Sequence, residues 1–543
     1  MNLHNQIKKI EFIGIYLYLL LYGSLSYLLL SRFPLVHSDE PWLAGMTEAY
    51  LNNKSLFVTE SFFDLMPRTV HTIKSLYHLI QIPFISVFGY TITSVRMPSF
   101  IAGLLTLYIF YQLLRQIHKD TLISLLLTIL LSLNLQFIYA SHFARQEMLL
   151  CLSLVIAYST YVKYPLKPYI PALIIGISIA LHPNAFIIGG MVGILILRDT
   201  LLKKQTFKGL SAYILILLGF ALFHLGLTLA ANPDFFQQYF TYGKTLNVDA
   251  APFMRLHNFS DFYLKLYYQV TGTYYIPPQK TFFILYATFL ALAVFILLNT
   301  IRKNKSQKKQ HTMSYPSESS ALDISFSDPV LMVIAFNIGI YIIGRYNTTS
   351  FVFLIFPFYL LLSQLIFYFM KMYKGSWLIS FQKPIFIVFL STLVFVGFSS
   401  LSSLSNEVRK LSGQDYDAYS NEISAYIQED SIILGNLSSG FAFNNNQFYD
   451  IRNLNYLENT TIEEYITARQ INTIIYYEEY DYIERNPMWS ILYGDAFNPS
   501  ELKEFLNEKA TLSHTFTDMY YGSRIIRYMG DYPWKIYIYT LEP

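Results

Sequence analysis

The chain has 543 residues, of which 53% are hydrophobic and only 14% are charged. This composition excludes an ordinary soluble enzyme, because several apolar runs reach the length of a bilayer span. The net charge of +3 gives no indication of a nucleic-acid partner, and the single cysteine, Cys151, excludes disulfides and thiolate metal clusters.

The first span is predicted at about residues 10–31. Lys8 and Lys9 precede it and place the N-terminus in the cytoplasm by the positive-inside rule. Its apolar stretch is too long for a cleavable signal, and no small-residue cleavage site follows. We therefore expect the first span to stay uncleaved in the membrane. A first outer loop, residues 33–93, then contains two amphipathic pieces that are typical of helices at a membrane surface.

The stretch Tyr169–Leu197 decides the topology of the remaining chain. His182-Pro183-Asn184 interrupts it, and the proline breaks or kinks a helix. One kinked span would place the basic loop Arg302–Lys309 outside, whereas two short spans that meet at His182 place every basic cluster inside. We therefore predict two. The other spans are expected near 94–114, 121–138, 209–230, 281–301, 328–345, 350–370 and 384–400, with one more that ends at Lys163.

The predicted fold is a polytopic α-helical membrane protein with about eleven transmembrane helices and a C-terminal extracytoplasmic α/β domain. The membrane domain covers residues 1–404 and includes a second outer loop at 231–280. Residues 405–543 are more polar, and short β-like runs alternate there with helical stretches, as in "SIILGNL", "INTIIYY" and "WKIYIYTL".

The stretch "FPLVHSDEPWLAGMTEAY" places two acids where the chain leaves the first span. Ser38, Asp39 and Glu40 just before Pro41 are typical of a helix N-terminus. The alternative is that a carboxylate held at the membrane surface removes a proton from a substrate. Taken alone, the stretch favours the cap.

The predicted topology gathers further polar residues on the outer side. Ionisable residues beside hydrocarbon are costly, so such a collection is a candidate functional site. Local alternatives remain open: Arg145 and Glu147 can pair with each other, and Lys280 can reach lipid headgroups. His182 and Asn184 can cap a broken helix. The candidates are His37, Asp39, Glu40, His142, Arg145, Glu147, His182, Asn184, Lys280 and Arg345.

One reaction fits this set. Sugar transfer outside the cytoplasmic membrane uses polyprenyl-phosphate donors, a carboxylate base for the acceptor, and arginine for the departing phosphate. The alternatives are a transporter or flippase of lipid-linked sugars, a ligase or polymerase that uses pyrophosphate-linked oligosaccharides, and a membrane-anchored sensor. A divalent cation held by Asp39 and Glu40 is a further possibility.

Three segments in register resemble the bacterial protein-mannosyltransferase and aminoarabinose-transferase-like proteins, glycosyltransferase family 39 and its relatives. They are "SDEPWLAGMTEAYLNN", "SVRMPSFIAGLLTLYIFYQLL" and "YASHFARQEMLLCLSL". "LHPNAF" and "GRYNTTSFVFLIFPF" are similar to later landmarks of the group. The resemblance covers about residues 1–400 and implies the GT-C fold, a polyprenyl-phosphate-linked sugar as donor, and a glycan, lipid or protein acceptor at the cytoplasmic membrane.

The resemblance also implies roles for individual residues. Asp39 matches the family's base, and Glu40 matches the acidic neighbour that orients the acceptor or the site. Arg145 and Glu147 match the pair near the donor phosphate, and Arg345 would be a second phosphate ligand. The chain departs from many relatives at Gln146, where they have proline. No metal ligand set is predicted.

Overall fold

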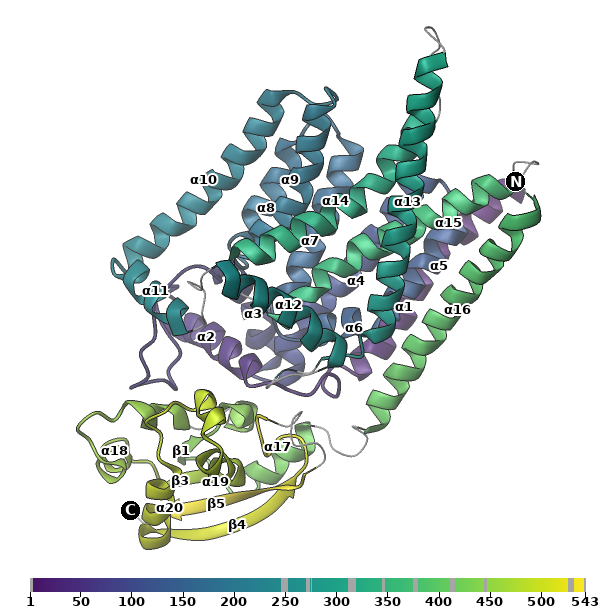
Figure 1. Cartoon of the computed structure of the whole chain (residues 1–543). Helices are drawn as coiled ribbons and strands as arrows, with labels where there is room; N and C mark the ends of the chain where they lie inside the picture. Colours follow the sequence, from purple (N-terminus) through teal and green to yellow (C-terminus); the bar gives the residue numbers. More distant parts are fainter. Residues whose placement is uncertain are drawn as a thin grey trace.

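The computed structural model describes residues 3–245, 252–269, 274, 276–310, 319–343, 347–374, 379–410, 416–443, 447–525 and 532–541. Long helices form a bundle, and a small domain with a sheet packs against one end of it (Figure 1). The N-terminus and the projecting end of α13 lie at the opposite end.

Each predicted span overlaps one or two helices of the described residues. The helices of the bundle are α1 (Leu3–Leu28), α4 (Ile92–His118), α5 (Thr121–Ser132), α6 (Leu135–His142), α7 (Glu147–Lys163), α8 (Tyr169–Ser178), α9 (Ala185–Leu201), α10 (Phe207–Ala231), α13 (Lys280–Gln310), α14 (Ser319–Ile343), η1 (Thr348–Phe351) with α15 (Val352–Lys374), and α16 (Ile379–Lys410). Within the described residues, five helices are long and apolar enough to cross a membrane, or six with one bent pair.

The bent pair departs from the prediction of one straight span at 121–138. Helices α5 and α6 meet at 67°. The Asn134 side chain accepts the backbone N–H of Phe137 and so begins a new helix inside the apolar run. The stretch around Pro183 also divides into two helices, as predicted. Helix α8 alone is only about 15 Å long, which is too short to span a bilayer.

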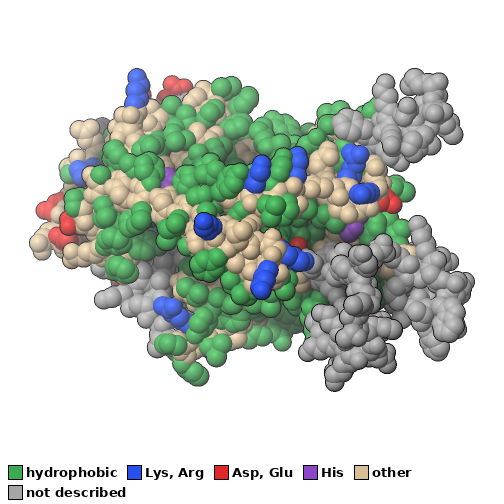
Figure 2. Space-filling model, turned by 90° about the horizontal axis from the view of Figure 1, so that it is seen from above, with side chains coloured by type: hydrophobic (Ala, Val, Ile, Leu, Met, Phe, Trp, Pro, Cys, Tyr) green, Lys and Arg blue, Asp and Glu red, His purple; other side chains and the backbone are tan. Residues whose placement is uncertain are grey.

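The connections at the end of the bundle away from the sheet domain carry exposed basic residues. Viewed from that end, Lys and Arg side chains are prominent near the middle of a largely apolar and neutral face (Figure 2). Exposed lysines in these connections are Lys119, Lys163, Lys167, Lys203 and Lys204. This pattern agrees with the loops that the positive-inside rule assigns to the cytoplasm.

The two loops that the sequence predicts to be outside contain surface helices near the sheet domain (Figure 1). Helices α2 (Asp39–Asn53) and α3 (Ser75–Phe88) lie in the first outer loop, and α11 (Phe235–Thr245) and α12 (Pro252–Tyr268) lie in the second. Phe62 packs against α2 at Gly45, where any larger side chain would meet its ring.

The C-terminal domain has a mixed five-stranded sheet with the order β2-β1-β3-β5-β4. The strands are β1 (Ile432–Gly435), β2 (Gln447–Asp450), β3 (Thr473–Tyr477), β4 (Ala510–Asp518) and β5 (Trp534–Leu541), and the helices are α17 (Tyr416–Ser424), η2 (Leu437–Phe443), η3 (Ile451–Tyr456), α18 (Ile462–Ala468), α19 (Glu478–Arg485), η4 (Pro487–Leu492) and α20 (Pro499–Lys509). Strands β1, β2 and β3 are parallel, and β5 is antiparallel to β3 and β4. The sequence predicted β1, β3 and β5 but not β2 or β4.

The hydrophobic core of this domain continues into the membrane domain. One buried cluster joins Val36 and Phe143, beside the first outer loop, to Ile433 and Ile536 of the sheet. A shared core of this kind stabilises the two domains together rather than separately. The C-terminal domain is therefore part of the wall around the outer loops.

Candidate active site

Helix α2 begins at the acidic pair, but its N-terminus is not capped as the sequence suggested. Ser38 is the N-cap residue, and its side chain accepts no hydrogen bond from the helix. Its hydroxyl is buried without a partner among the described residues. The two carboxylates that follow are instead held by arginines distant in sequence, Arg96 on α4 and Arg145 in the α6–α7 turn.

Glu40 is fully enclosed. Each of its carboxylate oxygens accepts a guanidinium N–H of Arg96 at 2.7 Å, and both side chains have no exposed surface. The backbone N–H groups of Ala144 and His37 donate to the same carboxylate at 2.9 and 3.1 Å. With its lone pairs bound in this way, Glu40 joins α2, α4 and the α6–α7 turn, and a substrate has no access to it.

Asp39 has a different environment. Its side chain is 24% exposed, and one of its oxygens accepts hydrogen bonds from Arg145 and from the hydroxyl of Tyr274. Arg145 also donates to the Tyr274 oxygen, at 2.6 Å. These three groups come from residues 39, 145 and 274 and form one closed network. The predicted meeting of Asp39 with Arg145 is therefore present in the structure.

The charge on Asp39 is stabilised by this network. Burial raises the pKa of the Asp39 carboxyl, but the neighbouring His37, the Arg145 guanidinium and the Tyr274 hydroxyl together lower it by more. The net result is a pKa well below the ordinary value of an aspartic acid. Asp39 is thus an ionised carboxylate at neutral pH, with part of its surface open to solvent.

His37 lies beside this carboxylate as a neutral ring. Its Nδ1 accepts the backbone N–H of Asp39 at 3.0 Å, so this nitrogen carries no proton. The ring stacks on Tyr274 with centroids 4.2 Å apart. Burial, opposed by the charge of Asp39 and reinforced by nearby arginines, lowers the pKa of His37 to about 4. His37 therefore positions Tyr274 and the start of α2.

Arg145 is held from its other side by Glu147. Their side chains form an ion pair at 3.2 Å, and both are nearly buried. The hydroxyl of Thr349 donates to Glu147 at 2.8 Å, which connects this pair to η1. Arg145 and Glu147 do pair, as one interpretation of the sequence proposed. Arg145 also binds Asp39, so it bridges the two carboxylates. Arg345 lies outside the described residues.

The other predicted residues have structural contacts. His142 is fully buried, and its Nδ1 lies 2.9 Å from the carbonyl oxygen of Phe33, where it pins the exit of α1. His182 Nδ1 accepts the backbone N–H of Asn184 at 3.1 Å, so this part of the helix break is locally capped. Asn184 also donates to Ser350 at 3.2 Å and so reaches η1 beside Thr349.

Sequence reasoning missed a group that attaches the C-terminal domain above α2. The indole of Trp42 lies between the guanidinium groups of Arg68 and Arg452, each 4.7 Å from its centroid. Its N–H donates to Glu60 at 2.6 Å, and Glu60 pairs with Arg68 at 3.0 Å. Trp42 is one turn beyond Asp39, so this stack fixes the domain close to the carboxylate.

The backbone of the same region is also tied to the C-terminal domain. Asn453 accepts the N–H groups of Leu65 and Met66 and donates to the carbonyl of Phe62 at 2.9 Å. A Cβ at Gly440 would lie 2.9 Å from the Pro41 Cβ, so only glycine allows this approach to α2. The domain therefore fits closely over the first turn of α2.

The two acids do not form a shared oxygen site. Asp39 and Glu40 are bound by different arginines, Arg145 and Arg96. In the part of the chain that the structure describes, no group of three or more His, Cys, Asp or Glu side chains is arranged to hold a metal ion. The two carboxylates thus have separate roles in this geometry.

Comparison with known proteins supports the resemblance. Residues 27–235 match the sequence model of the family described as dolichyl-phosphate-mannose-protein mannosyltransferase. No curated protein matches the chain. Among solved structures, ArnT from Cupriavidus metallidurans bound to undecaprenyl phosphate is similar over 97% of both chains, with 11% identity and a TM-score of 0.52.

The apo state of the same ArnT has a TM-score of 0.50, 10% identity and 97% coverage of both chains. The oligosaccharyltransferase AglB from Archaeoglobus fulgidus is less similar, at a TM-score of 0.44 and 12% identity over 93% of this chain and 73% of that one. The resemblance to the mannosyltransferase and aminoarabinose-transferase-like group is confirmed. The family match and the shared fold indicate a membrane glycosyltransferase of the GT-C type.

Proposed function

We propose that this protein transfers a sugar from a polyprenyl-phosphate donor to an acceptor on the extracytoplasmic side of the cytoplasmic membrane, with inversion at the anomeric carbon. The observation that carries the proposal is the contact between Asp39 and Arg145. A partly exposed carboxylate and a guanidinium on adjacent outer turns are a base and a phosphate ligand for this reaction. The match of residues 27–235 to the mannosyltransferase family supports the same chemistry.

In the proposed reaction, Asp39 takes the proton of an acceptor hydroxyl or amine. The acceptor atom forms a bond to the anomeric carbon while the bond from that carbon to the phosphate oxygen breaks. The electron pair leaves with the phosphate, and the product is polyprenyl phosphate. Arg145 binds that phosphate and stabilises its additional charge.

The contact between Arg145 and Asp39 indicates an order of events. Arg145 is bound to Asp39, and this contact helps to hold the pKa of Asp39 low. A donor phosphate competes for the same guanidinium. Its binding weakens the ion pair and raises the pKa of Asp39, because a neighbouring positive charge is now shared. Donor binding thereby makes Asp39 a stronger base.

Other residues have supporting roles in the proposal. Glu40 and Arg96 position α2 rather than touch a substrate, which fits the orienting role that the family resemblance implies. Tyr274 and His37 hold the Asp39 carboxylate in place. Arg345 remains proposed as a second phosphate ligand on the resemblance alone.

The test is reconstitution in vesicles with a panel of polyprenyl-phosphate sugars, scored by release of free lipid phosphate. Asp39→Asn should abolish release while the protein stays folded, with a thermal unfolding temperature below that of the wild type because the ion pair with Arg145 is lost. Asp261→Asn, the same change at a half-exposed outer carboxylate that pairs with Lys265, is the matched control and should retain full release. Unimpaired release by Asp39→Asn would remove Asp39 from the mechanism.

A further inference from the structure

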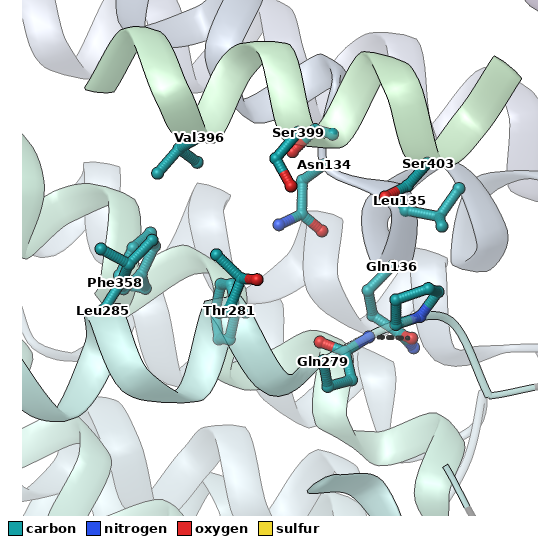
Figure 3. Close-up of a pocket in the computed structure, with 13 residues that line it drawn as sticks. Asn134, Leu135, Gln136, Gln279, Thr281, Leu285, Phe358, Val396, Ser399 and Ser403 are labelled. Atoms are coloured by element: carbon teal, nitrogen blue, oxygen red, sulfur yellow. Dashed lines mark hydrogen bonds between the residues drawn. The ribbon is translucent and has the colours of Figure 1, made fainter. Parts of the chain in front are cut away.

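A polar groove lies between α13 and α16 at the end of the bundle that carries the C-terminal domain. Thirteen residues line a small space of about 60 Å³ that opens to the outside. Figure 3 shows Ser399 on α16 facing Asn134 across this space, with Thr281 on the α13 side. Gln279 donates to Gln136 at 3.3 Å on its floor.

One wall of the groove is a face of α16. Four of its lining residues follow helical spacing, at positions 396, 399, 400 and 403. The other face carries Val394 and Phe398, whose side chains are 73% and 74% exposed, and they face hydrocarbon in a membrane. On the facing helix, Ile284 is 57% exposed next to the groove residue Leu285. The polar groove therefore lies between two lipid-facing surfaces.

The hydroxyls that line the groove differ from other hydroxyls in the apolar helices. Serine and threonine in apolar helices commonly donate to the carbonyl four residues earlier. Ser153 and Ser178 do so at 3.0 and 2.8 Å, and Thr288 does so at 2.8 Å. Across the described ranges, no such bond, or any other hydrogen bond, is formed by the hydroxyls of the groove residues Ser399, Ser400, Ser403 and Thr281. Their hydrogen-bonding capacity is available to a ligand.

The chemistry of the lining indicates what such a ligand is. None of the thirteen residues carries a charge, so the groove does not match a phosphate or a carboxylate. Seven amide and hydroxyl side chains beside six apolar residues match a neutral group that has several hydroxyls and an apolar ring face. A lipid tail leaves these polar groups without partners, which is costly in hydrocarbon.

The groove is near the candidate active site. Gln136 and His142 are six residues apart on α6, about 9 Å along the helix. Arg145 follows three residues later. From the second side, Gln279 is five residues beyond Tyr274, so the chain spans at most about 18 Å between them. One substrate molecule can therefore occupy the groove and also present a reacting group to Asp39.

We propose that this groove binds an uncharged sugar of a lipid-linked glycan and presents its neighbouring part to Asp39. The inference rests on the proposed function and narrows its acceptor to a membrane-anchored glycolipid. The anchor remains in the bilayer beside α13 and α16, while the sugar hydroxyls bond to the serine face of α16. The two substrates are distinguished by their charge. The donor phosphate binds Arg145, and the neutral sugar binds the groove.

The experiment uses the full-length protein in phosphatidylglycerol vesicles that contain diglucosyl diacylglycerol with a photoactivatable diazirine. Labelled peptides are located by mass spectrometry after irradiation. The same diacylglycerol without sugar is the second probe, and soluble maltose is the competitor. The test variant is Ser399→Ala with Ser403→Ala, and the matched control is Ser153→Ala with Ser178→Ala, which removes two hydroxyls that already have helix partners.

We expect the sugar-bearing probe to label α13 or α16, and the groove variant to reduce this labelling about tenfold through the loss of two hydrogen bonds. The control variant should label like the wild type, and both variants should unfold at the wild-type temperature. Equal labelling by the sugar-free probe, or undiminished labelling of the groove variant, would overturn the proposal. Displacement by maltose at a concentration equal to that of the probe would also overturn it, because it assigns the site to soluble glycans.

The outcome is separable from that of the proposed function. Labelling requires no donor, so it is measured without a polyprenyl-phosphate sugar. Asp39→Asn that still releases lipid phosphate, together with normal labelling, defeats the transferase mechanism and leaves a glycolipid site. If lipid-phosphate release depends on Asp39 but labelling does not depend on the sugar, the transferase mechanism stands and the proposed glycolipid site is refuted.

Discussion

Arg96 holds both carboxylate oxygens of Glu40 at 2.7 Å, and neither side chain has exposed surface. The pair joins α4 to the first turn of α2. The guanidinium also donates to the carbonyl of Leu30 at 2.7 Å, so the same residue fixes the end of the first helix. The position of Asp39, one residue before Glu40, therefore depends on an ion pair that no substrate reaches.

Glu40→Gln should be one of the most destabilising single changes near the site. It leaves the charge of Arg96 buried without a counter-charge, which costs about 3–5 kcal/mol. We expect a large fall in the thermal unfolding temperature in detergent micelles, accompanied by loss of activity. The double variant Glu40→Gln with Arg96→Met should recover part of the loss, because it removes the unpaired charge. Wild-type unfolding of Glu40→Gln would contradict a structural role.

Arg145→Gln should change the pH dependence of stability in a defined direction. The folded-state pKa of Asp39 lies below its unfolded value of about 4, so this carboxylate adds stability above pH 4 that is lost as pH falls through the folded value. Without Arg145 the folded pKa rises and that contribution shrinks. The difference in unfolding temperature between wild type and variant should be largest near pH 7 and smaller near pH 3. A difference that is constant over this range would refute the assignment.

His37 should destabilise the protein as pH falls from about 6.5 to about 4. Its folded pKa is about 4, below the ordinary value, so the unfolded chain takes up a proton that the folded protein excludes. The contribution to stability is full above pH 6.5 and declines by up to about 3 kcal/mol at pH 4. His37→Asn should unfold with a shallower pH dependence over this interval, measured by thermal scans in one buffer series. Equal slopes would show that His37 is protonated in the folded protein.

The sequence predicted where helices occur because apolar runs and proline are local signals, although among the described residues only five or six of these helices are long and apolar enough to cross a membrane. The break at Pro183 is an example, since a proline acts on the helix that contains it. The bend between α5 and α6 was missed for the opposite reason. It depends on one asparagine cap, at Asn134, inside a run that is otherwise continuous in hydropathy.

The site was predictable only in part. Asp39 and Arg145 stand out as charged residues on outer turns, and the topology brings them to one side. Arg96 is a charged residue near the start of an apolar helix. Its partner, Glu40, is 56 residues away, and no local sequence pattern predicts this pairing. Tyr274 is one of 46 tyrosines, and its role depends on a contact across 235 residues.

Arg452→Ala should reduce transfer although Arg452 lies in the C-terminal domain. The change removes one side of the stack on Trp42 and leaves Asp450 without its partner, so the domain no longer fixes the first turn of α2. We expect about a tenfold loss of lipid-phosphate release and faster protease cleavage between the domains. Arg469→Ala is the matched control at the same interface, because Arg469 is partly exposed and its ion pair with Asp64 contributes little. Equal effects of the two variants would show that the stack has no special role.

Tyr274→Phe tests whether the closed network around Asp39 matters for chemistry. The hydroxyl donates to Asp39 and accepts from Arg145, so its loss frees the carboxylate on one side without removing either charge. Hydrogen bonds to charged groups contribute about 1.5–3 kcal/mol, which corresponds to a loss of about tenfold to a hundredfold if the bond orients Asp39 in the transition state. We expect this loss in kcat, with KM for the donor nearly unchanged, because Arg145 remains to bind the phosphate. Tyr239→Phe, at an exposed tyrosine of α11, should leave both constants unchanged. A higher KM with unchanged kcat for Tyr274→Phe would instead assign the hydroxyl to donor binding.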